Sequence, residues 1–171
     1  MEIDLTGPVG TSGALKLYKD NKDFFEARFQ AFFCRQIEQM EQPCENDNYE
    51  IMLAKYADCI YICTITDGGL YGALWGGCEK LNCGCEVFLK RIPIRQETVE
   101  ITELTGDDPY EIESFGDLLI FSDNSQLPPR EWVWIGRTTD MKDRVIINDA
   151  NRRFLTPPKR QKTDTQNRKR K

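Results

Sequence analysis

Apolar residues recur at two different spacings along the chain, and each spacing predicts a different kind of element. Near the N-terminus four phenylalanines fall at helical spacing, namely Phe25, Phe29, Phe32 and Phe33. Asp20 or Asn21 can cap the first turn, so we expect a helix from Asp20 to Cys34 with one aromatic face. We expect this face to pack on the rest of the protein; the alternative is a stripe that binds a partner.

Beyond Ile37 the helical spacing gives way to short alternating apolar runs that are separated by Gly, Asn, Asp and Pro. The pattern predicts eight strands, at Tyr49–Leu53, Cys59–Thr66, Tyr71–Trp75, Cys85–Ile92, Val99–Leu104, Leu118–Ser122, Glu131–Arg137 and Arg144–Asn148. Eight short strands in a chain of 171 residues are typical of small barrels or a sandwich.

The β-rich part of the sequence repeats itself. The phrase Asp47–Ile51 (DNYEI) returns 61 residues later as Asp108–Ile112 (DPYEI), and each copy is followed by an acid and an apolar run. A period of about sixty residues suits a small complete barrel better than a solenoid unit. We therefore expect two related modules, at 20–92 and 93–156, with a flexible N-terminus (1–19) and a disordered tail (157–171).

The order of signals in each module resembles the Src-homology-3 (SH3) family. Thr105–Ile112 resembles an RT loop, Gly116–Ile120 the step into the next strand, and Glu131–Arg137 the aromatic strand. The resemblance implies a mainly β fold of two tandem SH3-like barrels, the first extended by the N-terminal helix. Both modules lack the stacked aromatics that bind proline-rich peptides in that family, so we expect no ordinary proline-peptide binding from the first module and at most weak binding from the second.

The resemblance and the charge pattern together suggest a surface for a protein partner. In the second module we expect partner contacts from four acidic residues and one tryptophan, namely Asp107, Asp108, Glu111, Glu113 and Trp132. Such carboxylates would pair with a partner that carries a basic segment. Trp132 has a second interpretation, as an ordinary packed aromatic.

The net charge of −5 is divided unevenly along the chain. The tail from residue 158 to 171 carries a net +6 and leaves −11 for the rest. Its basic residues predict binding to a nuclear import receptor, with contact to nucleic acid as the alternative: Lys159, Arg160, Lys162, Arg168, Lys169, Arg170 and Lys171. At the other end Ile3, Asp4 and Leu5 form a candidate SUMO-binding strand; the alternatives are an ordinary flexible terminus and an edge strand that packs on its own domain.

The sequence offers little for catalysis. It contains no histidine, which excludes Ser-His and Cys-His nucleophile pairs. The seven cysteines include no Cys-x-x-Cys pair, so we expect buried thiols rather than a zinc site, and no cofactor. Gly68-Gly69 and Gly76-Gly77 are read as turn glycines, because neither pair is predicted to follow a strand and open a helix as a phosphate loop does.

The predicted function is therefore that of a non-catalytic nuclear adaptor that binds a protein through its acidic loops. The alternative is a nucleic-acid or chromatin binder built from tandem Tudor-, KOW- or OB-like barrels, with a viral accessory protein as one version of it. No apolar run approaches the ~20 residues of a membrane span, so no membrane contact is expected.

Overall fold

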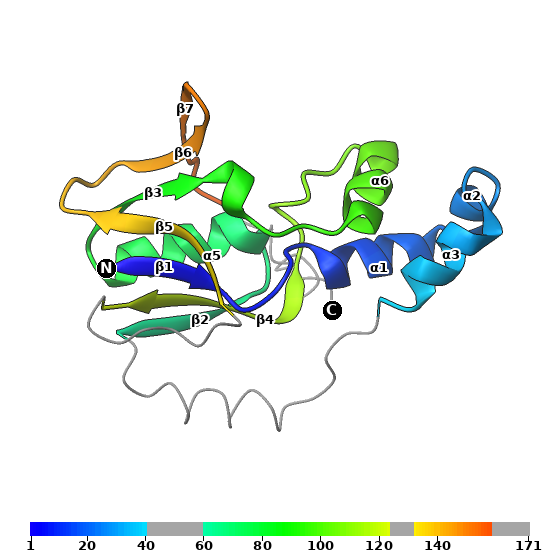
Figure 1. The fold of residues 1–171 in the computed structure, drawn as a ribbon, viewed down its shortest axis with the longest axis horizontal. Helices are drawn as coiled ribbons and strands as arrows, with labels where there is room; N and C mark the ends of the chain where they lie inside the picture. The colour runs from blue at the N-terminus through cyan, green and yellow to red at the C-terminus, as the bar shows by residue number, and fades with distance from the viewer. Residues whose placement is uncertain (41–59, 124–131, 159–171) are drawn as a thin grey trace, which may run out of the picture.

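The computed structural model describes residues 1–40, 60–123 and 132–158. These parts form an open mixed sheet with helices, not two barrels (Figure 1). In chain order the elements are β1 (Glu2–Leu5), α1 (Thr11–Asp20), α2 (Lys22–Glu26), α3 (Ala31–Glu38), β2 (Tyr61–Ile65), α5 (Gly69–Lys80), β3 (Gly84–Phe88), the 3-10 turn η1 (Leu89–Arg91), α6 (Gln96–Thr105), β4 (Ser114–Ser122), β5 (Val133–Thr139), β6 (Arg144–Asn148) and β7 (Asn151–Phe154).

The seven described strands form one sheet in the order β2-β4-β1-β5-β3-β6-β7. Neighbouring strands are antiparallel except β3 and β6, which run parallel. Strands from both predicted modules therefore pair within a single sheet. The prediction of tandem SH3-like barrels is wrong, because pairings between distant parts of the chain override the local repeat.

The strand β1 lies near the centre of this sheet. Its residues pair with β4 on one side and with β5 on the other, so that Leu5 lies opposite both Leu119 and Val133. Ile3 and Leu5 are completely buried. The stretch expected to be a flexible end is thus a core strand, and both of its edges are already paired. Adding Ile3–Leu5 as a strand to a SUMO-like partner is incompatible with this arrangement.

The helix α5 covers one face of the sheet (Figure 1) and builds the main core with it. Leu70, Leu74 and Cys78 are fully buried at intervals of four, which is helical spacing. The predicted strand Tyr71–Trp75 is therefore wrong. The aromatic and glycine-rich composition of this stretch hid the helical spacing of its buried residues. The predicted strand Val99–Leu104 is likewise part of α6, where Thr98, Ile101 and Thr102 are buried.

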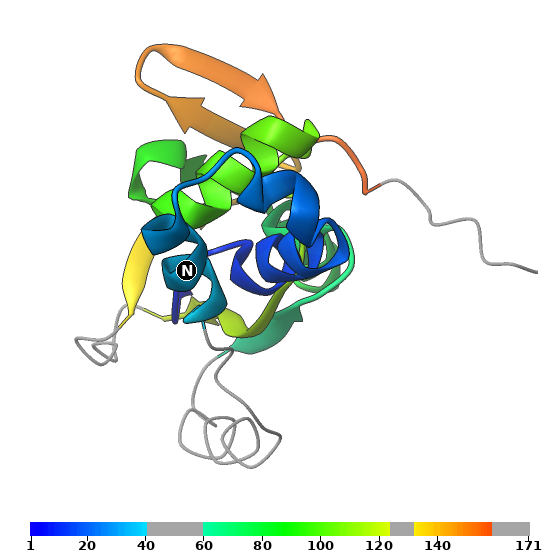
Figure 2. The same ribbon diagram turned by 90° about the vertical axis from the view of Figure 1, so that its right-hand side faces the viewer.

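A second core joins α1, α2, α3 and α6 at one end of the sheet (Figure 2). The single predicted helix Asp20–Cys34 is instead the end of α1, all of α2 and the start of α3. Phe25 is fully buried and stacks on the ring of Phe29 with centroids 5.7 Å apart, which confirms packing within the protein for this part of the aromatic face. Phe32 is 63% exposed.

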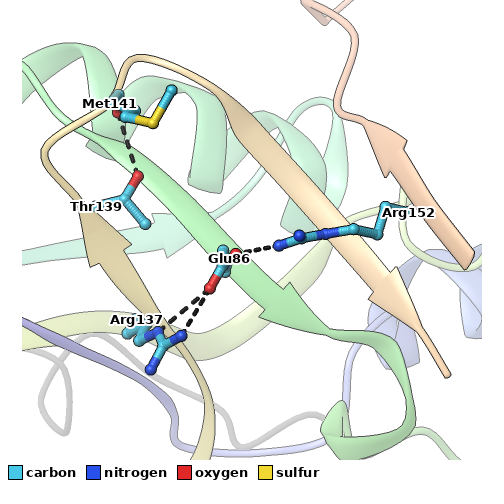
Figure 3. A network of polar contacts seen from close by, with 5 residues as sticks. All are labelled: Glu86, Arg137, Thr139, Met141 and Arg152. Atoms are coloured by element: carbon cyan, nitrogen blue, oxygen red, sulfur yellow. Dashed lines mark hydrogen bonds and ion pairs between the residues drawn. The ribbon is translucent and has the colours of Figure 1, made fainter. Parts of the chain in front are cut away.

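The face of the sheet opposite α5 carries an ion-pair network centred on Glu86 of β3 (Figure 3). Glu86 accepts a hydrogen bond of 2.9 Å from Arg137 of β5 and pairs with Arg152 of β7. The Arg137 guanidinium, helped by Arg152, holds the pKa of Glu86 below its usual range. Because both arginines are largely exposed, the network contributes little free energy and chiefly orders these side chains across three strands.

Five other predicted strands overlap observed ones. The overlaps are β2 with Cys59–Thr66, β3 with Cys85–Ile92, β4 with Leu118–Ser122, β5 with Glu131–Arg137 and β6 with Arg144–Asn148. The predicted strand Tyr49–Leu53 lies outside the described residues. Residues Leu118 to Phe121 are all buried, as a continuous apolar run in an inner strand requires. Across the described ranges, no helix combines the length and apolar character that crossing a bilayer would need.

Candidate functional site

Two strands lead into helices through glycine turns. The turn Thr6–Gly10 joins β1 to α1, and the turn Thr66–Gly68 joins β2 to α5. Gly10 and Gly68 precede their helices with φ of 72° and 82°, a backbone conformation that favours glycine. The expectation that Gly68-Gly69 does not follow a strand and open a helix is therefore wrong. A helix N-terminus of this kind presents backbone N–H groups and a partial positive charge.

The segment Asp108–Ser114, which joins α6 to β4, packs against both turns; we call it the bridging segment. The N–H of Gly13 donates to the Glu113 carbonyl at 3.0 Å, and the N–H of Tyr71 donates to the Tyr110 carbonyl at 3.2 Å. A Cβ at Gly69 would lie only 2.5 Å from the Tyr110 carbonyl oxygen. The absence of a side chain at Gly69 therefore allows the bridging segment to reach α5.

A cleft of about 260 Å³ opens where these parts meet. We call it the glycine-turn cleft; it is lined by Gly13, Lys16, Leu17 and Asp20 of α1, by Asp67 and Gly68, and by Glu111, Ile112 and Glu113. Thr66 and Asp67 are exposed and Gly68 is half-buried, so the turn before α5 is open to solvent beside the cleft, whereas Gly69 and Leu70 of the helix are buried.

The charges around the glycine-turn cleft are mostly negative. Lys16 is its one lining cation, and its amine lies 3.9 Å from Glu113, whereas Asp20, Asp67 and Glu111 add three more carboxylates. Such a surface attracts cations and repels a free polyphosphate. In the ranges that the structure covers, no three cysteine, aspartate or glutamate side chains converge to hold a metal ion.

A half-buried carboxyl group, that of Asp117, lies behind the β1–α1 turn. The Asp117 side chain fits against the backbone of Gly7, where an added Cβ would lie 2.0 Å from Asp117 Oδ1. Burial raises the pKa of Asp117 to about 7, and the charge of Arg95 offsets only part of this effect. Asp117 therefore exchanges its proton near neutral pH, a property common at functional sites.

Two stacked tyrosines fasten the bridging segment to α5. The rings of Tyr71 and Tyr110 lie 5.4 Å apart, and the guanidinium of Arg153 lies 5.0 Å from the Tyr71 ring centre. Arg153 also donates a hydrogen bond to the Tyr71 hydroxyl. Burial raises the pKa of both phenols, so they stay neutral at physiological pH. The stack holds one wall of the cleft in place.

The residues expected to contact a partner are divided by the fold. Glu111 and Glu113 line the cleft. Asp108 accepts the N–H of Tyr110 at 2.9 Å and so shapes the bridging segment. Asp107 is exposed after α6, and Trp132 lies half-buried just before β5, outside the lining. Their role as partner contacts stays a prediction, as does that of the basic tail, whose residues 159–171 lie outside the described ranges.

Sequence reasoning missed Thr6–Gly13 and Asp67–Gly69 as site-forming stretches. A usable signal was present, because each stretch places glycine between an apolar run and a helical pattern. It was overlooked since the first run was read as a flexible end and the helix after Gly69 as a strand.

Comparison with solved structures supports the observed fold. No protein-family model and no curated protein matches the sequence. Solved structures with a similar fold include hydrogenase maturation protein HypE (TM-score 0.73, 15% identity, 95% of this chain and 54% of that chain). They also include HypE of E. coli (0.73, 16%, 94% and 50%) and the thiamine monophosphate kinase of Aquifex aeolicus (0.60, 18%, 89% and 51%).

These similarities show a PurM-like α/β fold. The observed fold contradicts the prediction of tandem SH3-like barrels. It also contradicts the Tudor-, KOW- and OB-like alternatives, because these are small barrels and the described strands form an open seven-stranded sheet. The non-catalytic adaptor rested on the barrel fold and is corrected too, since proteins of the observed fold include a kinase. The chain spans about half the length of the solved proteins that it matches.

Proposed function

We propose that this chain belongs to an ATP-dependent enzyme and binds the magnesium–ATP complex at the glycine-turn cleft. Two structures of similar fold motivate the choice of ligand. One is HypE in complex with ATP (TM-score 0.70, 17% identity), and the other is a thiamine monophosphate kinase with AMPPCP and TMP (0.61, 17%). Because both neighbours are about twice as long as this chain, the acceptor of the phosphoryl group is left unassigned.

The observation that carries the proposal is the solvent-exposed turn that precedes α5 at the cleft. This turn leaves Thr66 and Asp67 exposed beside Gly68, so a phosphate can approach the positive end of the α5 dipole there, while the N–H groups of Gly69 and Tyr71 already donate within the protein. At α1 the corresponding turn is buried at Val9 and Gly10, and the N–H of Gly10 donates to Ser114. A phosphate is therefore assigned to the α5 side.

The negative charge of the lining decides the form of the nucleotide. Free ATP would be repelled by Asp20, Asp67, Glu111 and Glu113, whereas a magnesium ion on the phosphates lowers this repulsion. Magnesium keeps several waters and is commonly held by one or two carboxylates together with substrate phosphates. Asp67, adjacent to Gly68, is placed to contact the hydrated ion.

The size of the cleft limits what it holds. Ligand pockets measure on the order of 300–1,000 Å³, and this cleft measures about 260 Å³. We assign it the phosphate and metal end of the nucleotide, with the base lying outside.

The proposal is tested by calorimetric titration of the full chain with ATP, with and without magnesium. We expect saturable binding only with magnesium, and Asp67→Asn to weaken it by about tenfold, equivalent to ~1.4 kcal/mol. The control is Asp23→Asn on α2, an exposed acid away from the cleft. No saturable binding, or equal affinity in the wild type and Asp67→Asn, would refute the assignment.

We also propose that the protein acts with a protein partner, in part because one structure of similar fold is a HypE–HypF complex (TM-score 0.62, 15% identity). That the partner carries a basic segment stays a prediction from the exposed acids.

Nuclear import through the basic tail is a separate proposal, which a fluorescent fusion with and without residues 159–171 would test.

A further inference from the structure

After β7 the chain is held beside the first turns of α5. The Leu155 side chain is buried in the main core, and its N–H donates to the Arg144 carbonyl at 2.8 Å. Arg153 donates a hydrogen bond to the Tyr71 hydroxyl, and its guanidinium lies 5.0 Å from the centre of the Tyr71 ring. These contacts fix the position from which the C-terminal residues start.

Pro158, the last described residue, lies against the turn that precedes α5. A Cβ added at Gly68 would lie 3.4 Å from Pro158 Cβ, and one added at Gly72 would lie 4.0 Å from it. Gly68 lines the glycine-turn cleft. Pro157 and Pro158 also restrict the backbone, because each proline fixes its φ at about −65° and limits the residue before it to extended conformations. The residues after Pro158 therefore begin at the edge of the cleft.

The residues that follow Pro158 carry charges opposite to those of the cleft. Residues 159–162 (KRQK) contain three basic side chains and no acidic one, and we call Lys159, Arg160 and Lys162 the near basic run. The cleft is lined by one amine, that of Lys16, and by four carboxylates, those of Asp20, Asp67, Glu111 and Glu113.

Most of these carboxylates are available to basic groups. Asp20, Asp67 and Glu111 are exposed. Within the described ranges none of these three forms an ion pair, and Glu113 pairs with Lys16 at 3.9 Å. Three carboxylates of the cleft can therefore receive the near basic run without breaking an existing pair.

Chain length selects the basic residues that reach the cleft. An extended chain spans at most about 3.5 Å per residue, so the near basic run lies within about 14 Å of Pro158 along the backbone. The far basic run, residues 168–171, begins ten residues after Pro158, and bringing it to the cleft would close a longer loop at a greater entropic cost. Attachment at the edge of the cleft gives the near run an effective concentration on the order of millimolar.

We propose that the near basic run binds the carboxylates of the glycine-turn cleft in its own chain and competes there with magnesium–ATP. The contact follows from the position of Pro158 and from the charges, whereas the competition rests on the proposed function. Asp67, which the proposed function places against the hydrated metal ion, is adjacent to the glycine that Pro158 contacts. One exposed ion pair contributes little alone, but three tethered charges act together. The near basic run is thus an internal inhibitor of nucleotide binding.

Zero-length cross-linking of the full-length protein with a carbodiimide tests the contact without nucleotide. The reagent joins a lysine amine directly to a carboxylate, and mass spectrometry of tryptic peptides identifies the two residues. We expect links from Lys159 or Lys162 to Asp67, Asp20 or Glu111. An equal mixture of isotope-labelled and unlabelled protein distinguishes links within one chain from links between two chains.

The cross-links are mapped in the wild type and so do not depend on how a variant folds. The absence of links from the near basic run to the cleft would overturn the proposal. Cleft links that come from the far basic run alone would overturn it as well. Links that join labelled to unlabelled peptides would show that the run binds a second copy, which also contradicts binding within one chain.

Two triple variants of the full-length protein remove the same charge from different places. The near variant combines Lys159→Gln, Arg160→Gln and Lys162→Gln, and its matched control, the far variant, combines Arg168→Gln, Lys169→Gln and Arg170→Gln. In calorimetric titration the near variant should bind magnesium–ATP about threefold to tenfold more tightly than the wild type, because no basic run competes for the carboxylates. The far variant should bind it no more tightly, since the loss of positive charge by itself disfavours an anionic ligand.

The contact and the proposed function fail separately in these measurements. Cross-links in a protein that binds no magnesium–ATP would confirm the contact and refute the proposed function together with the competition. Magnesium–ATP binding without cross-links from the near basic run would refute the contact and leave the proposed function standing. Equal affinities of the wild type and the near variant would overturn the competition.

Discussion

Gly69 is the residue at which the bridging segment comes closest to a helix. Its φ is 59°, and a Cβ there would lie 2.5 Å from the Tyr110 carbonyl oxygen and 2.6 Å from Glu111 C and Ile112 O. Gly76, seven residues further along α5, is exposed and has nothing within 4 Å of an added Cβ. The two glycines share a helix but differ in what surrounds them.

We predict that Gly69→Ala lowers the free energy of unfolding by about 2–4 kcal/mol, through backbone strain and the clash with the bridging segment. The matched change Gly76→Ala should raise it by roughly 0.5–1 kcal/mol, since alanine is the better helix former. Urea denaturation of both variants measures the difference. Equal effects would show that the bridging segment does not press on α5.

Asp117 gives the stability a characteristic pH dependence. Its pKa is about 7 in the folded protein against an ordinary 3.8, so between these values the folded state holds a proton that the unfolded state has released. The Asp117 contribution therefore falls as pH rises through this range, by at most about 1.4 kcal/mol per pH unit, and is constant above it.

We predict that Asp117→Asn removes this slope and is more stable than the wild type above pH 7. Denaturation series from pH 5 to pH 8 would measure it, with Asp140→Asn, at an exposed turn, as the control. A wild-type slope that survives in Asp117→Asn would show that another group is responsible.

Among the elements, β1 and α5 decide the architecture. β1 contributes two fully buried side chains, Ile3 and Leu5, and is paired along both edges. Only four residues long, it gives a weak local signal, and its partners in β4 lie more than a hundred residues away. Local alternation can show that such a stretch is extended but not that it is central.

We predict that Leu5→Ala costs about 2–5 kcal/mol of unfolding free energy, the range for truncating a buried leucine. Met141→Ala, at a side chain that is 67% exposed, should change it by less than about 0.5 kcal/mol. Thermal or urea unfolding of the pair would measure this. A Leu5→Ala variant as stable as the wild type would contradict a core position for β1 and support the prediction of a flexible N-terminus.

The elements that were predicted correctly share a feature that the missed ones lack. β6 was placed at its true bounds, and β4 was largely placed, because their β-branched or apolar runs agree with their final environment. In α5 the aromatics and glycines carry a weak helical signal, and the helix forms because its buried face packs on the sheet. Tertiary packing outweighed propensity there.

At the scale of the whole molecule, the second copy of the repeated phrase lies where distant parts of the chain meet. Asp108–Ile112 belongs to the bridging segment, which joins two glycine turns far apart in sequence, whereas Asp47–Ile51 lies outside the described residues. Glu111 and Glu113 were singled out from the sequence as exposed acids and do line the cleft. Lys16, Asp67 and Gly68 could not be joined to them, since only the sheet order brings α1 and α5 together.

Hydrogen exchange of the full-length protein with and without magnesium–ATP tests the central claim most directly. Magnesium–ATP should slow exchange in peptides covering the α5 turn (66–70) and the bridging segment, and leave α2 and α3 unchanged. ATP without magnesium should have no such effect, because the acidic lining repels it. Slowed exchange confined to the helices α2 and α3, or no change at saturating magnesium–ATP, would contradict the placement of the nucleotide at the glycine-turn cleft.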